Sequence, residues 1–227
     1  MTSGVDWNED YADPAADVNQ FYAAPVEPDM DATDSYLRKL RRELPPGQRW
    51  HYNTGETNLL GVVVARATGK DLATYAAEKI WAPYGMEQAA WWMLDRSGDE
   101  HVGCCIAATT RDFACFGQFV LDGARIDWQS VVADGWLQAA TSKQVDIGQP
   151  GRGYGYPWWT VDNGTWYAIG IHGQQVHVDP GRRVVVAFNS ASPTAFSGEA
   201  LAARAALILA IRKAIDSEPQ GKLGRLE

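Results

Sequence analysis

The chain has 227 residues, of which 46% are hydrophobic and 21% charged, a composition typical of one large or two small globular domains. Its net charge of −8, with one short basic cluster at residues 38–42, lacks the basic stripe that a nucleic-acid groove requires. No apolar run reaches the roughly 18 residues needed to span a membrane, and the first residues do not resemble a signal peptide. We therefore expect no nucleic-acid or membrane partner and favour a cytoplasmic location.

The first two thirds of the chain predict helices joined by loops. Residues 1–30 are rich in Asp, Pro, Asn and Ala and predict a loop. Beyond them, apolar periodicity with Asp or Thr caps predicts helices over residues 31–43, about 57–68, 71–83, 109–123 and 129–139. The second of these helices carries an apolar run at residues 59–65 that covers nearly every face, so we expect it to be buried.

The character of the sequence changes near residue 153. Alternating aromatic and β-branched residues between Asn-Gly and Pro-Gly turns predict four strands, at residues 154–161, 165–170, 174–178 and 183–189. A long amphipathic helix follows at residues 198–215. We expect an α+β fold with a helical region at 1–150, an antiparallel sheet plus C-terminal helix at 151–216, and a polar tail at 217–227. Four strands with one covering helix leave a sheet edge open, through which the chain could self-associate.

The cysteines and histidines give no metal or cofactor signal. Cys104, Cys105 and Cys115 fit neither a disulfide framework nor metal-ligand spacing, so we expect buried free thiols. His172 and His177 lack a third ligand. The Gly-rich residues 148–155 lack the strand-then-helix context of a phosphate loop. We predict no metal and no cofactor.

One tripeptide could carry chemistry, Tyr52-Asn53-Thr54 at the start of the apolar helix. A tyrosine hydroxyl has a pKa near 10, too high for a base at neutral pH, but a neighbouring ammonium lowers it enough to accept a proton from a serine. A helix start can present both Tyr52 and Thr54 to one pocket. The tripeptide alone is weak evidence, and a tyrosine simply packed at a helix start is the competing interpretation.

Four segments in order strengthen the catalytic interpretation. Residues 48–70 resemble the tyrosine motif of the serine β-lactamase-like hydrolases, which include class C β-lactamases, family VIII esterases and 6-aminohexanoate-dimer hydrolases. Met1-Thr-Ser-Gly resembles the turn that follows this family's nucleophile helix. Ile106-Ala-Ala-Thr-Thr-Arg-Asp-Phe-Ala-Cys-Phe-Gly117 resembles its Thr-x-x-Asp-x-Ala-x-Phe-Gly helix. Ile169-Gly-Ile-His-Gly-Gln-Gln-Val-His-Val-Asp-Pro180 resembles the strand carrying its Lys-Thr-Gly-type motif. The resemblance covers nearly the whole chain.

The resemblance implies hydrolysis of an ester or amide through an acyl-enzyme on a serine, with a lysine one helical turn later. Tyr52 matches the tyrosine that shares the proton transfers. The oxyanion hole would draw on the backbone at Gly170 and Ile171. Expected pocket residues are Thr54, Trp158, His172 and Gly173. Trp158 and Trp159 are adjacent on a strand, so only one of the two can face the pocket.

Two departures from the family pattern limit this prediction. The strand has Gly-Ile-His-Gly where a Lys-Thr-Gly would stand, which disfavours β-lactam substrates and favours small linear esters or amides. No Ser-x-x-Lys occurs anywhere in the chain. We therefore expect Met1 to be an internal methionine of a longer hydrolase, truncated here at the N-terminus, and this chain to be inactive alone. Two alternatives stay open: a non-catalytic module that binds a small molecule or peptide, and a product without a stable fold.

Overall fold

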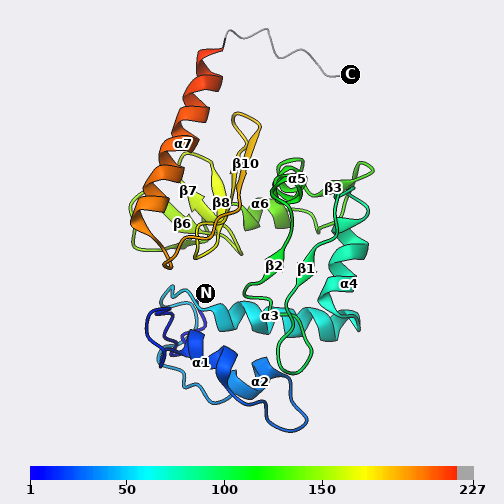
Figure 1. Cartoon of the computed structure of the whole chain (residues 1–227), viewed down its shortest axis with the longest axis vertical. Coiled ribbons are helices and arrows are strands. Elements are labelled where there is room, and N and C mark those ends of the chain that lie inside the picture. The colour runs from blue at the N-terminus through cyan, green and yellow to red at the C-terminus, as the bar shows by residue number, and fades with distance from the viewer. Residues whose placement is uncertain (219–227) are drawn as a thin grey trace.

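A six-stranded antiparallel sheet forms the centre of the molecule in the computed structural model, which describes residues 1–218 (Figure 1). The strand order is β10-β9-β8-β7-β6-β5. The strands are β5 (Val145–Asp146), β6 (Arg152–Tyr154), β7 (Trp159–Val161), β8 (Trp166–Ile169), β9 (Gln175–Asp179) and β10 (Val184–Phe188). The α+β class is thus confirmed, and β10 leaves one edge of this sheet without a neighbouring strand among the described residues.

The sheet is wider than the four strands predicted. The expected strand at 154–161 is in fact two strands, β6 and β7, that pair with each other. Pro157 lies between them, where a residue without an N–H cannot continue a ladder. β5 then pairs with the outer side of β6. The other three strands lie where the sequence predicted them, within one residue at each end.

Two helices cover the two faces of this sheet. Figure 1 shows α5 (Thr110–Leu121) on one side and α7 (Gly198–Ser217) on the other. Gly117 lets α5 approach closely, because a Cβ there would lie 2.5 Å from Val185 Cγ1. α7 is tied to the opposite face by an ion pair between Arg212 and Asp179 at 3.0 Å. Both helices match the predicted ranges, and the tail expected at 217–227 lies, from residue 219 onward, outside the described residues.

A second group of helices lies below the sheet in Figure 1, with α1 and α2 on the far side of α3. The elements are α1 (Asp17–Ala23), α2 (Ala32–Leu37), α3 (Thr54–Thr68), α4 (Leu72–Ala76) and a π-helical turn at Ala77–Trp81. Trp7, Val18 and Phe21 form a small buried cluster there. Burial of Val18 and Phe21 explains why α1 forms within the segment predicted as loop.

The prediction that α3 is buried on all sides is wrong. Leu60 is 63% exposed and Val63 is 55% exposed, whereas Asn58 and Gly61 are buried. The buried face is small and polar because it holds the loop at residues 102–103. Asn58 Oδ1 accepts hydrogen bonds from the N–H of Val102 at 2.9 Å and of Gly103 at 3.2 Å.

The remaining elements are short: β1 (Trp91–Trp92), β2 (Ile106–Ala107), β3 (Arg125–Ile126), β4 (Gln129–Ser130) and α6 (Trp136–Ala140). The helix predicted at 129–139 is wrong in its first half, because Asp127 and Trp128 adopt positive φ and form a hairpin between β3 and β4. Cys104 and Cys105 are joined by a disulfide, so the prediction of free thiols is right for Cys115 only. Within residues 1–218, no helix combines the length and apolarity that crossing a bilayer requires.

Candidate active site

Tyr52 lies just before α3, with its ring held among aromatic side chains of the sheet. Its ring stacks on Trp159 with centroids 5.7 Å apart and an interplanar angle of 17°. Tyr154 meets it edge-on at 6.2 Å, and Trp50 packs at 6.5 Å. These contacts fix the ring by packing, so the position of the hydroxyl is set before any ligand binds.

The start of α3 presents the rest of the tripeptide as predicted. Asn53 is the N-cap, in an extended conformation, and its side chain accepts a hydrogen bond from the Glu56 N–H at 3.1 Å. Thr54, the first helical residue, is buried. The helix therefore begins at Thr54, three residues earlier than the sequence pattern suggested.

Glu9, which the sequence did not predict as a site residue, accepts hydrogen bonds from several groups near the start of α3. Glu9 Oε1 accepts a hydrogen bond from the Tyr11 hydroxyl at 2.7 Å, and Oε2 accepts one from the Thr54 N–H at 3.0 Å. The Thr54 hydroxyl and the Trp7 indole N–H also donate to Glu9. The only signal in the sequence was the alternation Trp7-x-Glu9-x-Tyr11 in an acidic loop, which does not reveal which acidic residue packs inward.

The environment raises the pKa of Tyr52 instead of lowering it. Burial, followed by the nearby negative charge of Glu9, raises the pKa of Tyr52 to about 12. The same two causes raise the pKa of Tyr22 to about 12. No hydrogen bond from the described residues contributes to the Tyr52 shift. In this chain Tyr52 is therefore a neutral phenol at pH 7 and a weaker acid than an ordinary tyrosine.

The strand end carrying the expected oxyanion groups forms a tight turn between β8 and β9. The Gly170 N–H donates to the Gln174 carbonyl at 2.8 Å, so it is occupied within the turn. Among the described residues, the Ile171 N–H donates to no protein group. Its carbonyl accepts a hydrogen bond from the Phe196 N–H at 2.7 Å. Of the two predicted backbone donors, Ile171 is the one whose N–H the turn leaves available.

His172 and Gly173 complete this turn. The His172 carbonyl accepts a hydrogen bond from the Ser192 N–H, and its Nδ1 lies 2.8 Å from the Ser192 carbonyl oxygen. These two contacts fix the ring of His172. Gly173 has a φ of +101°, in the region that favours glycine.

A chain of contacts through Tyr11 and Phe196 links these two groups, and one of the predicted residues lies outside it. The Tyr11 ring packs against Phe196, with centroids 6.1 Å apart, and the Phe196 N–H is bonded to the Ile171 carbonyl. Tyr11 therefore connects Glu9 and Thr54 to the turn that holds Ile171. Trp158 does not join them, because it is 5% exposed and stacks on Phe116 in the core between the sheet and α5. Its neighbour Trp159 faces Tyr52 instead, as the alternation of strand side chains requires.

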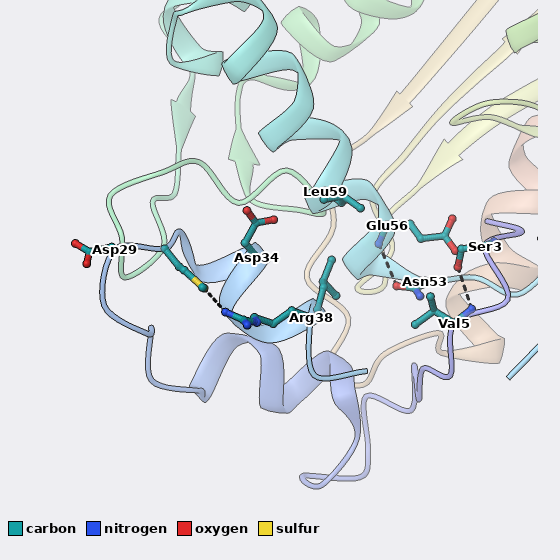
Figure 2. A pocket seen from close by; sticks show the side chains of 10 residues that line it. Ser3, Val5, Asp29, Asp34, Arg38, Asn53, Glu56 and Leu59 are labelled. Atoms are coloured by element: carbon teal, nitrogen blue, oxygen red, sulfur yellow. Dashed lines mark hydrogen bonds between the residues drawn. The ribbon is translucent and has the colours of Figure 1, made fainter. Parts of the chain in front are cut away.

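A cavity of about 630 Å³ lies beside the start of α3 and is distinct from the Tyr52 group. Figure 2 shows Asn53 and Glu56 on one side of it and Asp29 with Arg38 on the other. The lining includes Ser3, whose N–H donates to Glu56 Oε1 at 3.3 Å. Neither Tyr52 nor Thr54 lines this cavity, so it is not the candidate active site.

A model of the family described as Beta-lactamase matches residues 1–210. The chain belongs to this family. It is 28% identical over 233 residues to the 6-aminohexanoate-dimer hydrolase of Paenarthrobacter ureafaciens, an alignment that covers 96% of this chain and 59% of that protein. The family predicted from the four segments is thus confirmed.

Solved structures give the same fold. A Bacillus anthracis protein provisionally named 6-aminohexanoate-dimer hydrolase superimposes with a TM-score of 0.80 at 27% identity, covering 97% of this chain and 61% of that chain. A Mycobacterium bovis β-lactamase superimposes with a TM-score of 0.60 at 23% identity, covering 77% of this chain and 68% of that chain. The β-lactamase-like fold is confirmed. The chain spans about three fifths of the length of the two 6-aminohexanoate-dimer hydrolases.

Proposed function

We propose that this chain provides the tyrosine side of a serine-hydrolase active site that cleaves esters or amides through an acyl-enzyme. The observation that supports it most is the position of Tyr52, fixed by stacking on Trp159 and set directly before a capped helix. Its relatives include proteins named 6-aminohexanoate-dimer hydrolase. The comparisons favour this hydrolase over the non-catalytic binding module.

We propose that the nucleophile comes from polypeptide outside these 227 residues, because no Ser-x-x-Lys occurs among them. A phenol with a pKa of about 12 becomes a useful base only beside a cation, and the lysine of Ser-x-x-Lys is that cation in the proposed site. We therefore propose that the chain alone does not turn over substrate.

The proposed substrates are small linear esters or amides. The turn reads Gly170-Ile-His-Gly173 in place of a Lys-Thr-Gly, so the strand offers no ammonium for a β-lactam carboxylate. The Ile171 N–H is the proposed oxyanion donor from this strand, because the Gly170 N–H is already bonded. Tyr52, with Thr54 beside it, is proposed to pass a proton between the serine and the leaving group.

A hybrid protein tests this proposal. A segment that carries a Ser-x-x-Lys is joined in front of this chain, and hydrolysis of a p-nitrophenyl ester is measured. We expect activity that Tyr52→Phe lowers by about 10²–10⁴ in kcat, the usual contribution of an acid–base group. Tyr156→Phe is the matched control, because Tyr156 is 49% exposed and contacts Trp136 instead. A folded hybrid whose activity is unchanged by Tyr52→Phe would refute the assignment.

A further inference from the structure

Two adjacent cysteines form a disulfide in the loop between β1 and β2, and the proposed chemistry gives them no role. Cys104 and Cys105 are joined to each other, and both are partly exposed. The third cysteine, Cys115 in α5, is a free thiol. Disulfides that a dissolved thiol can reach are the ones that exchange with it. The pair therefore has the accessibility that reversible reduction requires.

The cysteine pair belongs to a loop, residues 101–105, that is bonded to the start of α3. Asn58 Oδ1 accepts the N–H groups of Val102 and Gly103, and Asn58 Nδ2 donates to the Thr54 carbonyl at 3.0 Å. A Cβ placed on Gly103 would lie 2.5 Å from Thr54 Cγ2, so the loop touches the first residue of α3. Figure 1 shows the segment between β1 and β2 passing α3. A shift of this loop therefore reaches Thr54 directly.

Tyr22 connects the disulfide to the charged part of the candidate site. Its hydroxyl donates to Cys104 Sγ at 3.6 Å, and its ring meets His101 edge-on with centroids 4.9 Å apart. Burial, followed by the charge of Glu9, raises the pKa of Tyr22 to about 12, with a smaller contribution from Tyr52. Tyr22 therefore contacts the 101–105 loop and lies within electrostatic range of Glu9 and Tyr52.

Cys105 has a backbone conformation that is costly for a residue with a Cβ. Its φ is +80°, in the left-handed region that favours glycine. Such residues keep this conformation only where the surrounding structure holds it. The small ring closed by the S–S bond limits the backbone of both cysteines, in the folded and in the unfolded chain. Reduction removes this limit, so the left-handed conformation of Cys105 then costs free energy on folding.

We propose that Cys104 and Cys105 form a reversible thiol–disulfide site that controls the active site through the 101–105 loop. The proposal rests on the proposed function, whose regulation it describes. In the oxidised state the loop is held against Asn58 and Thr54, which keeps the start of α3 in place. In the reduced state Cys105 relaxes from its left-handed conformation, the two hydrogen bonds from the loop to Asn58 loosen, and the hydrolase loses activity.

The reductant is a dithiol, for which dithiothreitol is the laboratory probe. One of its thiolates attacks a sulfur of the pair, which breaks the S–S bond and forms a mixed disulfide with that cysteine. The other cysteine leaves as a thiolate and takes up a proton. The second thiolate of the reagent then attacks the mixed disulfide and releases the remaining cysteine as a thiol. The pair gains two electrons and two protons, and the dithiol loses them as it closes into a cyclic disulfide.

Hydrogen exchange on the 227-residue chain, with and without dithiothreitol, tests the proposal. Alkylation with iodoacetamide should modify Cys115 alone before reduction and all three cysteines after it. Reduction should speed the exchange of the Val102 and Gly103 amides about fivefold or more. It should also lower the melting temperature by about 2–4 °C, the shift that one left-handed non-glycine residue causes in a chain of this length.

Two substitutions at residue 105 separate the redox effect from loss of the cysteine. Cys105→Gly accepts a positive φ without cost, so its amides should exchange like those of the oxidised wild type. Cys105→Ala has neither the disulfide nor this freedom, so it should behave like the reduced wild type. Neither variant should respond to dithiothreitol. Cys115→Ser is the matched control, because it keeps the pair and should respond like the wild type.

The wild-type chain compared in its two redox states decides the matter even if a variant does not fold. A pair that dithiothreitol leaves unreduced, equal exchange in the two states, or a response that persists in Cys105→Gly would overturn the proposal.

The hybrid protein tests the link to activity. Reduction should lower its kcat/KM by about fivefold or more, and Cys105→Gly should remove this dependence. Exchange that responds to reduction while hydrolysis does not would refute control of the active site. A hybrid inactive in both redox states would count against the proposed function alone, because exchange and melting require no hydrolysis.

Discussion

The Tyr52 hydroxyl is buried near the negative charge of Glu9, and this environment predicts how the stability of the chain changes at alkaline pH. Its folded pKa of about 12 exceeds the ordinary value of 10, so between these two pH values the unfolded chain loses a proton that the folded chain keeps. The contribution of Tyr52 to stability is therefore fully present below pH 10 and is lost as pH rises toward 12. Tyr52→Phe should lose less stability than the wild type between pH 9 and pH 11.

Urea unfolding at the two pH values measures this difference. Other buried tyrosines also contribute to the loss of unfolding free energy at high pH. The test is therefore the difference in this loss between Tyr52→Phe and the wild type. Tyr156→Phe, on an exposed tyrosine, should behave like the wild type. An identical pH dependence for Tyr52→Phe and wild type would contradict the buried environment assigned to Tyr52.

Glu9 gives a second prediction, because four donors converge on its carboxylate. Glu9→Gln has a single acceptor oxygen and should destabilise the chain by about 1–3 kcal/mol, the cost of leaving buried donors unpaired. It should also lower the pKa of Tyr52, since one charge that raises it is removed. The control is Glu43→Gln, whose ion pair with Arg49 is exposed and should cost less than about 1 kcal/mol. Similar losses in the two variants would contradict the role of Glu9.

At this scale the sequence predicted Tyr52 and Thr54 but not Glu9. A tyrosine before a helix start has a local pattern, and the helix start itself fixes where both side chains point. Which of the acidic residues near the N-terminus turns inward depends on packing against α3, far away in the chain, so no local pattern could identify it. Trp158 shows the converse: the strand pattern required one of the two tryptophans to face the core but could not say which.

Helix α3 has its larger apolar side chains on the outside, and this inverted arrangement can be tested. A Cβ on Gly61 would lie 2.1 Å from Val102 Cγ2, so Gly61→Ala should destabilise the chain by about 1–3 kcal/mol through overpacking, despite the better helix propensity of alanine. Leu60→Gln, on the exposed face, should change stability by less than about 0.5 kcal/mol.

Chemical denaturation of Gly61→Ala and Leu60→Gln measures the unfolding free energy of each variant. The reverse order, with Leu60→Gln costing more than Gly61→Ala, would show that the exposed face of α3 is packed in the chain as it folds in solution. The sequence could predict that α3 is apolar, but not which face the rest of these 227 residues covers.

Element boundaries follow the same reasoning. The first residues of α5 and α7 were predictable because Thr109 and Ser197 are local N-caps. The split between β6 and β7, the extra strand β5 and the hairpin of β3 and β4 were not, since they depend on turn geometry and on partners elsewhere in the sheet.

Across the whole molecule, the family and fold were predictable from four motifs in order, although each motif alone was weak. The proposed site divides between two parts of the structure: Tyr52 and Thr54 lie at the start of α3, and Ile171 and His172 lie in the turn after β8. Contacts of Tyr11 with Phe196 join them. The proposed chemistry needs a third component, the serine and lysine, which none of these elements contains.

The most direct test of this account is hydrolysis of a p-nitrophenyl ester by the purified 227-residue chain. We predict a rate equal to spontaneous hydrolysis for the wild type, Tyr52→Phe and Tyr156→Phe alike, because this sequence contains no Ser-x-x-Lys. Turnover by the wild type that Tyr52→Phe abolishes and Tyr156→Phe preserves would contradict the account. It would mean that another nucleophile within these residues works with Tyr52.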